Sequence, residues 1–575
     1  MFKKINPLIL RLFKSDIFKV LIIIFLAIFL RTFRLSFSPP RLTHDEMSIG
    51  YNAFSILKTG KDEWGRSFPL DFEAFGDHKL PGYIYSLVPL LNFLPLNSIT
   101  LKIPSILAGI FTVFGISLLV KEVTKNKNIA FLSAFILAVS PWAIHISRMA
   151  LESNMALTMF IWGLYFLVKT FDKKLDKKYW PFLAGMFFAL STYFYIAYRM
   201  ISALVLISFL VLGIIYKLNK KKIFFVFISF LIFTLPLASE MVGKSGSARF
   251  DQVSIFSNDG IEATILEQQN FCFLSQPRFL PKICRVIYNK PFLYIEKLSK
   301  NYLTFIFPTF LFIEGDQLEY LNDPAFAEFY LFLAPFYLLG LYSWYKKSGF
   351  KENLIKLSFL IAPIPSALVG DPQIVRGSVL LIFVSLFTAV GIYDVFENIK
   401  KKAFKNIYLI LMFVIFAISI SRFFISYSYI YPGKYENSFY QLSEEMANFL
   451  SEKESEYDLI YINKSIYPDA HILIAFYKNL DPSWYQENII RSEPDDFGFS
   501  HPIGLDKYEF GDNLIDQYIC EKSDQKILFV SNNIDIQSQF VFKDFSGVHK
   551  QAQMFDIDKT RDYLVNKKLI KNICN

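Results

Sequence analysis

Two adjacent carboxylates, Asp45 and Glu46, are the first side chains in this sequence whose types and spacing suit group-transfer chemistry. They end the run RLTHDE at 41–46, which follows a long apolar stretch. A carboxylate in that position can accept the proton of a substrate hydroxyl as the hydroxyl attacks, which is general base catalysis. The alternative is a pair of solvated loop acids, and the residues around them bear on the choice.

A second polar run, DHKLP at 77–81, offers one cation and two candidate metal ligands. Lys79 could neutralise a lipid phosphate as a point charge, or it could be an ordinary interfacial lysine attracted to anionic headgroups. Asp77 and His78 could hold a divalent cation, although two side chains are few ligands for a metal site. Both interpretations of Lys79 stay open at this point, and a metal at Asp77 and His78 is kept as an option.

Three arginines, Arg148, Arg199 and Arg376, each stand at a turn between two apolar runs. Ionisable groups near a bilayer are costly and usually face the protein interior or a cavity, so each arginine requires an anionic partner. That partner is either a nearby acidic residue or a ligand phosphate. For Arg148 the nearby acid is Glu152, four residues further on, which would make an ordinary helical ion pair.

The elements that must position these residues are membrane-spanning helices. The chain has 575 residues, 53% of them hydrophobic, and its apolar runs are continuous rather than alternating. Runs of about 17–25 apolar residues match a hydrocarbon core of about 30 Å, which only helices or closed barrels can cross. We expect about eleven helical spans, at residues 17–35, 99–120, 129–147, 154–171, 181–197, 199–216, 223–241, 325–345, 354–370, 374–394 and 406–425.

The basic residues predict the topology of these spans. The net charge of +9 comes from short clusters between the apolar runs, which argues against a nucleic-acid-binding protein. Short loops rich in Lys and Arg stay cytoplasmic. The clusters lie at 3–14, 121–127, 173–178, 217–222, 346–351 and 400–405. Even numbers of spans separate them, so the N-terminus is expected inside and the segments 36–98, 242–324 and 426–575 outside.

The outer end of the first span carries two arginines, Arg31 and Arg34. Long basic side chains at such a position can snorkel toward the headgroups or face a cavity. No small-residue cleavage site follows them, so we interpret the stretch as an uncleaved span rather than a signal peptide.

The four cysteines, Cys272, Cys284, Cys520 and Cys574, all fall in the segments expected outside. Disulfides persist in oxidising compartments outside the cytoplasm. We expect the pairs Cys272–Cys284 and Cys520–Cys574, because the members of each pair lie within one segment. Free thiols are the alternative, since sequence alone does not fix connectivity.

The first and last outer segments have different expected structures. Within the first, stretches 46–58 and 80–94 are partly apolar yet too short or too polar to span, which predicts two amphipathic helices along the membrane surface. The last segment mixes helix-like and strand-like stretches, which predicts a small extracytoplasmic α/β domain. It has no Gly-rich phosphate loop and no metal-ligand spacing, so we expect a scaffold or acceptor-binding role. The expected domains are 1–425 and 426–575.

Together these residues resemble the GT-C superfamily of membrane glycosyltransferases. The likeness is strongest to the branch, similar to glycosyltransferase family 39, that contains protein O-mannosyltransferases and the lipid A aminoarabinose transferase, and it covers most of 17–425. It rests on three elements: the acidic pair Asp45-Glu46, the lysine-proline element HKLP at 78–81, and the arginine-to-acid element Arg148 and Glu152. The run LFIEGD at 311–316 also resembles a re-entering outer-loop element of bacterial members.

The resemblance implies roles for individual residues. Asp45 is the implied catalytic base, Glu46 orients Asp45 or the acceptor, and Lys79 binds the carrier phosphate. Arg199 and Arg376 are weaker candidates for the same phosphate. No cofactor is required, and a divalent metal is possible.

Two departures from the aminoarabinose transferases bear on those roles. This chain has His78 where they carry Glu before the lysine, and Glu152 where they carry Asp at the second acidic site. Both changes alter the acidic groups available near the candidate site. They leave undetermined whether a metal binds and which substrate is used.

The implied function is that of an enzyme at the extracytoplasmic face of the plasma (inner) membrane. It would move a sugar, with inversion, from a polyprenyl-phosphate carrier to a hydroxyl of a glycan, lipid or protein acceptor. No nucleotide-binding fingerprint appears, and none is needed outside the cell. Two alternatives stay open: a transporter or flippase for lipid-linked sugars, for which we would expect inverted repeats, and a non-catalytic membrane protein whose outer domain binds a ligand.

Overall fold

The structure is a computed structural model whose contacts form two compact units. It describes residues 15–172, 177–242, 254–256, 260–275, 281–370, 372–435, 443–495, 498–512, 525–531, 540–543 and 550–556. The first unit holds the residues up to Phe33 and Ser105–Ser426, and the second holds Arg34–Pro104 and the residues from Tyr427 onward. The contacts thus group the first outer loop with the C-terminal segment, whereas the sequence-based division falls between 1–425 and 426–575.

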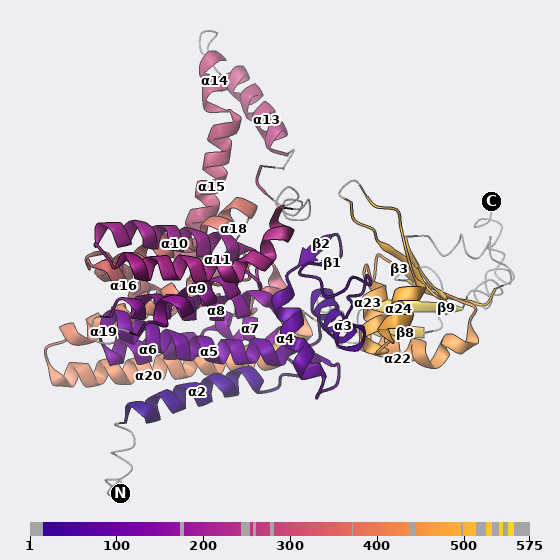
Figure 1. The fold of residues 1–575 in the computed structure, drawn as a ribbon, viewed down its shortest axis with the longest axis horizontal. Coiled ribbons are helices and arrows are strands. Elements are labelled where there is room, and N and C mark those ends of the chain that lie inside the picture. The colour runs from indigo at the N-terminus through magenta and orange to yellow at the C-terminus, as the bar shows by residue number, and fades with distance from the viewer. Residues whose placement is uncertain are drawn as a thin grey trace, which may run out of the picture. The chain divides into compact units, whose positions relative to one another are not determined.

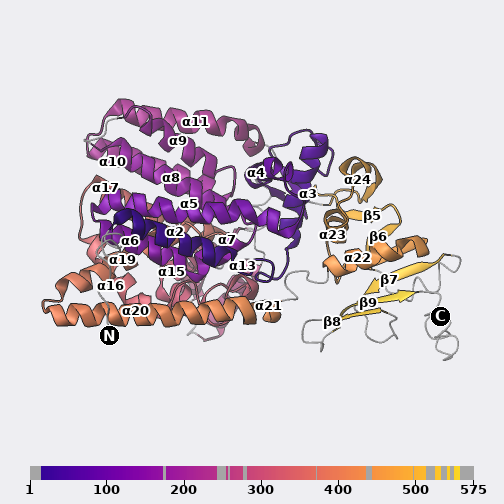
Figure 2. The same ribbon diagram turned by 90° about the horizontal axis from the view of Figure 1, so that it is seen from below.

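The first unit is a bundle in which most of the long helices run alongside one another (Figures 1 and 2). Its described helices are α2 (Asp16–Thr32), α5 (Ser98–Thr124, which begins in the second unit), α6 (Lys127–Val139), α7 (Pro141–Arg148), α8 (Glu152–Thr170), α9 (Trp180–Ser191), α10 (Ala197–Ile215), α11 (Lys220–Val242), α13 (Gly260–Ser275), α14 (Pro281–Ile287), α15 (Lys290–Ile306), α16 (Ala334–Tyr345), α17 (Phe350–Ile361), α18 (Ile364–Val369), α19 (Leu380–Asn398) and α20 (Lys402–Ile425).

Each of the eleven stretches expected to span the membrane contains a helix or a broken helix. Within the described residues, six helices are long and apolar enough to cross a membrane, or seven if a bent pair counts as one span. The helices α9 and α16 are apolar but shorter. The chain is therefore mostly helical with six to seven candidate spans, and the count of eleven stays a prediction.

The expected span at 129–147 is a broken helix. Helices α6 and α7 meet at an angle of 56°, because Pro141 has no N–H with which to continue the helix. The N–H of Trp142 turns away as well and donates to the carbonyl of Glu328 at 3.2 Å. The break therefore frees backbone carbonyls that need other donors in an apolar surrounding.

Arg31 on α2 supplies those donors. Its guanidinium donates to the carbonyls of Ala138 at 3.1 Å and Ala143 at 3.4 Å, and to the hydroxyl of Ser147 at 3.2 Å. The side chain is only 1% exposed. Arg31 thus neither snorkels nor faces an open cavity, since it fills the hydrogen-bonding gap at the break.

Two of the lysine clusters meet at one end of the bundle. Glu122 on α5 pairs with Lys169 at 2.8 Å and with Lys351 at 3.1 Å. Lys127, at the start of α6, pairs with Asp16 on α2 at 2.5 Å. The clusters at 121–127 and 346–351 therefore lie at the same end, as the expected topology requires. Which side of the membrane that end faces stays a prediction.

A disulfide joins Cys272 on α13 to Cys284 on α14, with their Cα atoms 5.9 Å apart. This is the pairing expected from their position within one outer segment. The expected partners Cys520 and Cys574 lie outside the described residues.

The second unit contains a seven-stranded mixed sheet in the order β4-β5-β6-β3-β7-β9-β8. Its strands are β3 (Leu459–Asn463), β4 (Ile489–Arg491), β5 (Pro502–Leu505), β6 (Tyr508–Gly511), β7 (Ile527–Ser531), β8 (Phe540–Lys543) and β9 (Lys550–Asp556). The central strand β3 runs parallel to β6 and β7 and is buried at all its positions, as expected of a strand covered on both faces. Three helices accompany the sheet: α22 (Ser443–Lys453), α23 (Ala470–Tyr477) and α24 (Pro482–Asn488).

The first outer loop folds onto this C-terminal part. It forms α3 (His44–Thr59) and α4 (Pro81–Leu91), in the stretches where two amphipathic helices were expected. Helix α3 packs against α4, α23 and α24. At Gly50 an added Cβ would lie 3.0 Å from the ring of Phe476, so the absence of a side chain permits this close approach. The position of α3 and α4 along a membrane surface stays a prediction.

Candidate active site

Asp45 stands in the first turn of α3, at a helix start fixed by a capping box. The hydroxyl of Thr43 accepts from the N–H of Glu46 at 3.3 Å, and Oε2 of Glu46 accepts from the N–H of Thr43 at 2.9 Å. Such a reciprocal pair satisfies two N–H groups that a helix start otherwise leaves unbonded. Between these residues the Asp45 side chain is 54% exposed, and the helix N-terminus favours its negative charge.

The Glu46 side chain forms part of this helix cap. It is fully buried, and its carboxylate accepts from both the N–H and the hydroxyl of Thr43. An acceptor molecule would need an exposed group to contact, which Glu46 does not offer. Its geometry fits an indirect role, in which it fixes the helical turn that carries Asp45.

Lys79 is positioned by a two-residue hairpin. Strand β1 (Phe72–Ala74) pairs antiparallel with β2 (Asp77–Lys79), and the turn residues Phe75 and Gly76 have φ values of 55° and 67°. Positive φ at both central positions is typical of the turn that matches the twist of two strands. Glycine adopts it readily, whereas a phenylalanine there is uncommon, which marks Phe75 as a residue held in place by its surroundings.

The hairpin brings Lys79 to Asp45. The Lys79 ammonium pairs with Oδ1 of Asp45, and Lys79 is only 7% exposed. Nε2 of His44 lies 3.6 Å from the same carboxylate oxygen. The ring of Phe75 packs edge-on against His44, with centroids 4.9 Å apart, and lies 5.6 Å from the Lys79 nitrogen. The two motifs that sequence placed 34 residues apart therefore form one charged cluster.

A second carboxylate, Asp469, belongs to the same cluster. It stands directly before α23. Burial raises the pKa of Asp469, as does the charge of Asp45, whereas His44 and Lys79 lower it. Sequence reasoning missed Asp469, because nothing in the chain order links a residue of the C-terminal segment to the first loop.

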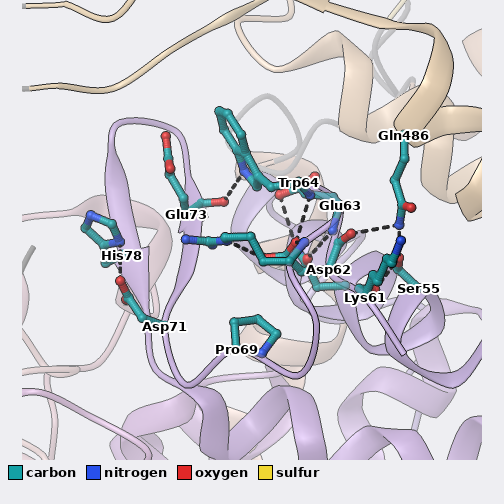
Figure 3. A network of polar contacts seen from close by, with 12 residues as sticks. Ser55, Lys61, Asp62, Glu63, Trp64, Pro69, Asp71, Glu73, His78 and Gln486 are labelled. Carbon is teal, nitrogen blue, oxygen red and sulfur yellow. Dashed lines mark hydrogen bonds and ion pairs between the residues drawn. The ribbon is translucent and has the colours of Figure 1, made fainter. Parts of the chain in front are cut away.

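His78 pairs with a residue other than the expected Asp77. Its Nδ1 lies 2.7 Å from Oδ2 of Asp71, and Figure 3 shows the two side chains next to each other. Burial lowers the pKa of His78, but the carboxylates of Asp71, Glu73 and Asp77 outweigh burial, so the pKa is raised. Oδ1 of Asp77 accepts the backbone N–H of His78 at 2.8 Å.

A metal at Asp77 and His78 stays a prediction. The imidazole nitrogen nearest an acid is already engaged with Asp71. Among the residues that the structure describes, no three His, Cys, Asp or Glu side chains gather as metal ligands. The contact between His78 and Asp71 in addition braces the hairpin that carries Lys79.

Arg148 and Glu152 lie on two successive helices rather than four residues apart within one helix. Arg148 is the last residue of α7 and Glu152 the first of α8. Arg148 is 2% exposed and donates to the carbonyl of Leu30 on α2 at 2.9 Å. A basic side chain that bonds a carbonyl in the last turn of a helix stabilises that helix end. At least part of the role of Arg148 is therefore structural.

Arg376 has an acidic neighbour in Asp316, the last residue of the run at 311–316. Asp316 accepts from the N–H groups of Ile374 at 2.6 Å and Leu318 at 2.8 Å. Burial raises the pKa of Asp316 to about 6, although these hydrogen bonds and Arg376 act to lower it. Of the two partners expected for Arg376, an acidic residue or a ligand phosphate, the structure therefore supports the acidic residue.

Arg199 lies in the first turn of α10, where its side chain is partly buried. Its expected role as a phosphate ligand stays a prediction.

Sequence reasoning gave no role to three polar residues of the second unit: Glu63, His471 and Arg491. The terminal nitrogen of Arg491 donates to the carbonyl of Glu63 at 3.0 Å, and the guanidinium lies 4.0 Å from the ring centroid of Trp64. The run GKDEWG at 60–65 showed polar groups in the first loop. The residues that contact this run lie more than 400 residues further along the chain. No local sequence pattern identifies them.

Comparison with known proteins supports the expected resemblance. The sequence model of the dolichyl-phosphate-mannose-protein mannosyltransferase family matches residues 82–239, a range that begins after Lys79. No curated protein sequence matches the chain.

Solved structures resemble the whole fold. ArnT from Cupriavidus metallidurans, solved bound to undecaprenyl phosphate, is 9% identical with a TM-score of 0.54, and the match covers 94% of this chain and 96% of ArnT. The Archaeoglobus fulgidus oligosaccharyltransferase, tethered with an acceptor peptide, is 14% identical with a TM-score of 0.51 over 90% of this chain and 69% of its own. The same enzyme with Zn and sulfate matches with a TM-score of 0.50, and the chain covers 61% of it.

The chain therefore spans about three fifths of the oligosaccharyltransferase in that last comparison. At 9% and 14% identity these likenesses concern the fold alone. Residues 82–239 match the dolichyl-phosphate-mannose-protein mannosyltransferase family, and the fold as a whole is similar to the folds of ArnT and the archaeal oligosaccharyltransferase.

Proposed function

We propose that this chain transfers a sugar from a polyprenyl-phosphate carrier to an acceptor hydroxyl at the extracytoplasmic face of the plasma membrane. The observation that carries the proposal is the pair formed by the exposed Asp45 carboxylate and the buried Lys79 ammonium. The match to mannosyltransferases that use dolichyl-phosphate-mannose supports a lipid-phosphate donor. The structure of ArnT with undecaprenyl phosphate supports the same chemistry on this fold.

In the proposed reaction the acceptor hydroxyl gives its proton to the Asp45 carboxylate as its oxygen attacks the anomeric carbon. The bond between that carbon and the phosphate oxygen breaks, and polyprenyl phosphate leaves with the bonding electrons. Attack opposite to the departing oxygen inverts the anomeric configuration. General base catalysis contributes about 10²–10⁴-fold, and a cation beside the departing phosphate stabilises the charge that develops there.

Lys79 links the two halves of this reaction. In the structure its ammonium is held by Asp45. A donor phosphate would offer the ammonium a second anionic partner, so Lys79 would contact both the base and the departing phosphate. Arg199 and Arg376 are further candidates for that phosphate.

Release of free polyprenyl phosphate tests the proposal. The full-length protein in liposomes is mixed with undecaprenyl-phosphate-linked radiolabelled mannose and with envelope acceptors, and products are separated by thin-layer chromatography. An enzyme releases undecaprenyl phosphate and labels the acceptor with the opposite anomeric configuration. Movement of intact donor across the bilayer without release would instead indicate a transporter. Neither release nor movement with mannose, arabinose or glucosamine donors would contradict the proposal.

A further inference from the structure

A pocket in the second unit lies between the first outer loop and the C-terminal part. It has an empty volume of about 310 Å³ and is open to solvent. This volume includes space that is continuous with the open solvent. Its polar lining includes Glu63, Trp64, Glu73, His471, Tyr485, Arg491, Ser500 and His501.

Three polar atoms of this lining have no hydrogen-bond partner within the described part of the chain: Oε2 of Glu63, the hydroxyl of Tyr485 and Nε of Arg491. Glu63 is 3% exposed and Tyr485 is fully buried. Oε1 of Glu63 accepts from the amide of Asn52 at 3.1 Å, so only its second oxygen is left. Buried polar groups are nearly always bonded, and three such atoms in one pocket call for a polar occupant.

The charges around the pocket favour a neutral occupant. Glu63 and Glu73 disfavour an anion, and Arg491 disfavours a cation. Burial raises the pKa of Glu63 to about 7 and lowers the pKa of His471 to about 3, so these groups carry little net charge. The side chains of the lining offer both donors and acceptors, which matches a molecule with several hydroxyl groups.

One aromatic ring connects this pocket to the candidate active site. Phe75 lines the pocket, and its ring centroid lies 5.9 Å from that of His471 and 4.9 Å from that of His44. His44 in turn lies beside Asp45. A molecule in the pocket would thus be separated from the charged cluster by the strained Phe75 turn, within the same compact unit.

We propose that this pocket binds a neutral saccharide unit of the acceptor or the donor through its hydroxyl groups. The inference rests on the proposed function and names the chemistry that would hold a substrate next to Asp45. The hydroxyl of Tyr485, the second oxygen of Glu63 and Nε of Arg491 are the groups that bind it.

Saturation-transfer NMR on the full-length protein tests this proposal. Phosphatidylcholine nanodiscs replace glycoside detergents, which would compete for the pocket. The probes are methyl α-mannopyranoside, methyl β-glucopyranoside and methyl N-acetyl-β-glucosaminide. Tyr485→Phe removes only the unbonded hydroxyl, so we expect an unchanged thermal midpoint and an affinity about three- to tenfold weaker. The matched control is Tyr51→Phe, whose ring contacts Tyr485 at 5.2 Å and whose hydroxyl bonds the carbonyl of Leu480 instead.

Glu63→Gln is a second variant, because it keeps the side-chain shape and should also weaken binding. Absence of binding by all three probes to the wild-type protein would overturn the proposal. Equal binding by wild type, Tyr485→Phe and Glu63→Gln would do so as well, since the unbonded atoms would then be satisfied by water.

Binding and transfer separate this inference from the proposed function. Saccharide binding that depends on Tyr485, in a protein that releases no polyprenyl phosphate, would support the pocket and contradict the transferase. Transfer without such binding would support the transferase and contradict the pocket. In an active protein, Tyr485→Phe should raise the KM of the acceptor if the pocket holds the acceptor, and that of the donor if it holds the donor sugar.

Discussion

Arg31 in the first unit and Lys79 in the second are both buried cations, and they differ in the partners that hold them. Arg31 donates to two backbone carbonyls and a serine hydroxyl at a helix break. Lys79 pairs with a carboxylate that is itself 54% exposed. The first cation replaces hydrogen bonds that the backbone has lost. The second holds a group that a substrate can reach.

The difference shows why a charged residue near the membrane does not by itself mark an active site. Both cations are buried, and both are costly there without a partner. A cation whose N–H groups donate to backbone carbonyls stabilises the fold. A cation that faces an accessible carboxylate can change partners when an anionic ligand arrives.

The largest expected effect on stability is that of Arg31→Met. It leaves the carbonyls of Ala138 and Ala143 without these donors, and we expect a loss of about 3–5 kcal/mol in the free energy of unfolding. Arg34→Met is the matched control, because Arg34 stacks on Phe37 and Tyr429 and should lose only about 1 kcal/mol. Thermal unfolding in micelles measures both. Equal midpoints for the two variants would contradict the structural role of Arg31.

Lys79→Met should show the reverse pattern. Transfer should fall about 10²–10³-fold, because the departing phosphate loses its cation. Stability should change little, since the remaining Asp45 carboxylate is half exposed and water can solvate it. The rate of acceptor labelling and the thermal midpoint are measured side by side. A large loss of stability with unchanged turnover would place Lys79 with Arg31 as a structural cation.

Glu63 is a buried acid, and its effect on stability should depend on pH. The folded protein holds the proton of Glu63 up to a pKa of about 7, whereas the ordinary pKa of a glutamate is 4.5. Burial dominates over the hydrogen bond from Asn52 and the charges of Arg491 and Lys79, and Asp62 adds to the rise. Stability should therefore fall by about 3 kcal/mol as pH rises from about 4.5 to 7 and stay lower above it. The Glu63→Gln variant should lose this part of the pH dependence. Thermal midpoints that vary identically with pH in the wild-type protein and in Glu63→Gln would contradict the prediction.

The smallest expected effect is that of Thr43→Ala. It removes the hydroxyl that caps α3, at a cost of about 1 kcal/mol. The first turn should loosen around Asp45, so transfer should fall by less than it does in Lys79→Met. Thr43→Ser, which keeps a capping hydroxyl, should restore both properties. Failure of serine to rescue would argue against the capping role.

Sequence predicted the helical stretches and the two motifs, because both are local patterns. Continuous apolar runs mark helices, and the helices α3 and α4 stand where amphipathic stretches were expected. The break at Pro141 was visible as a proline but not as a bend, since neighbouring donors such as Arg31 decide whether a break is tolerated.

The contacts of the candidate site could not be predicted in the same way. Asp45 and Lys79 were chosen from separate motifs, and their pairing depends on the Phe75-Gly76 turn, whose positive φ at a phenylalanine no propensity suggests. Asp469, Tyr485 and Arg491 come from the far end of the chain. Their meeting with the first loop is a long-range contact, for which a single sequence holds no periodic signal.

The most direct measurement of the central claim is the transfer rate of Asp45→Asn against that of Asp481→Asn. Asp481 caps α24, and asparagine caps a helix as well as aspartate does, so this control makes the same chemical change away from the charged cluster. We predict that Asp45→Asn folds normally and loses at least about 100-fold in transfer, while Asp481→Asn keeps the wild-type rate. Equal rates for Asp45→Asn and Asp481→Asn would contradict the assignment of Asp45 as the base.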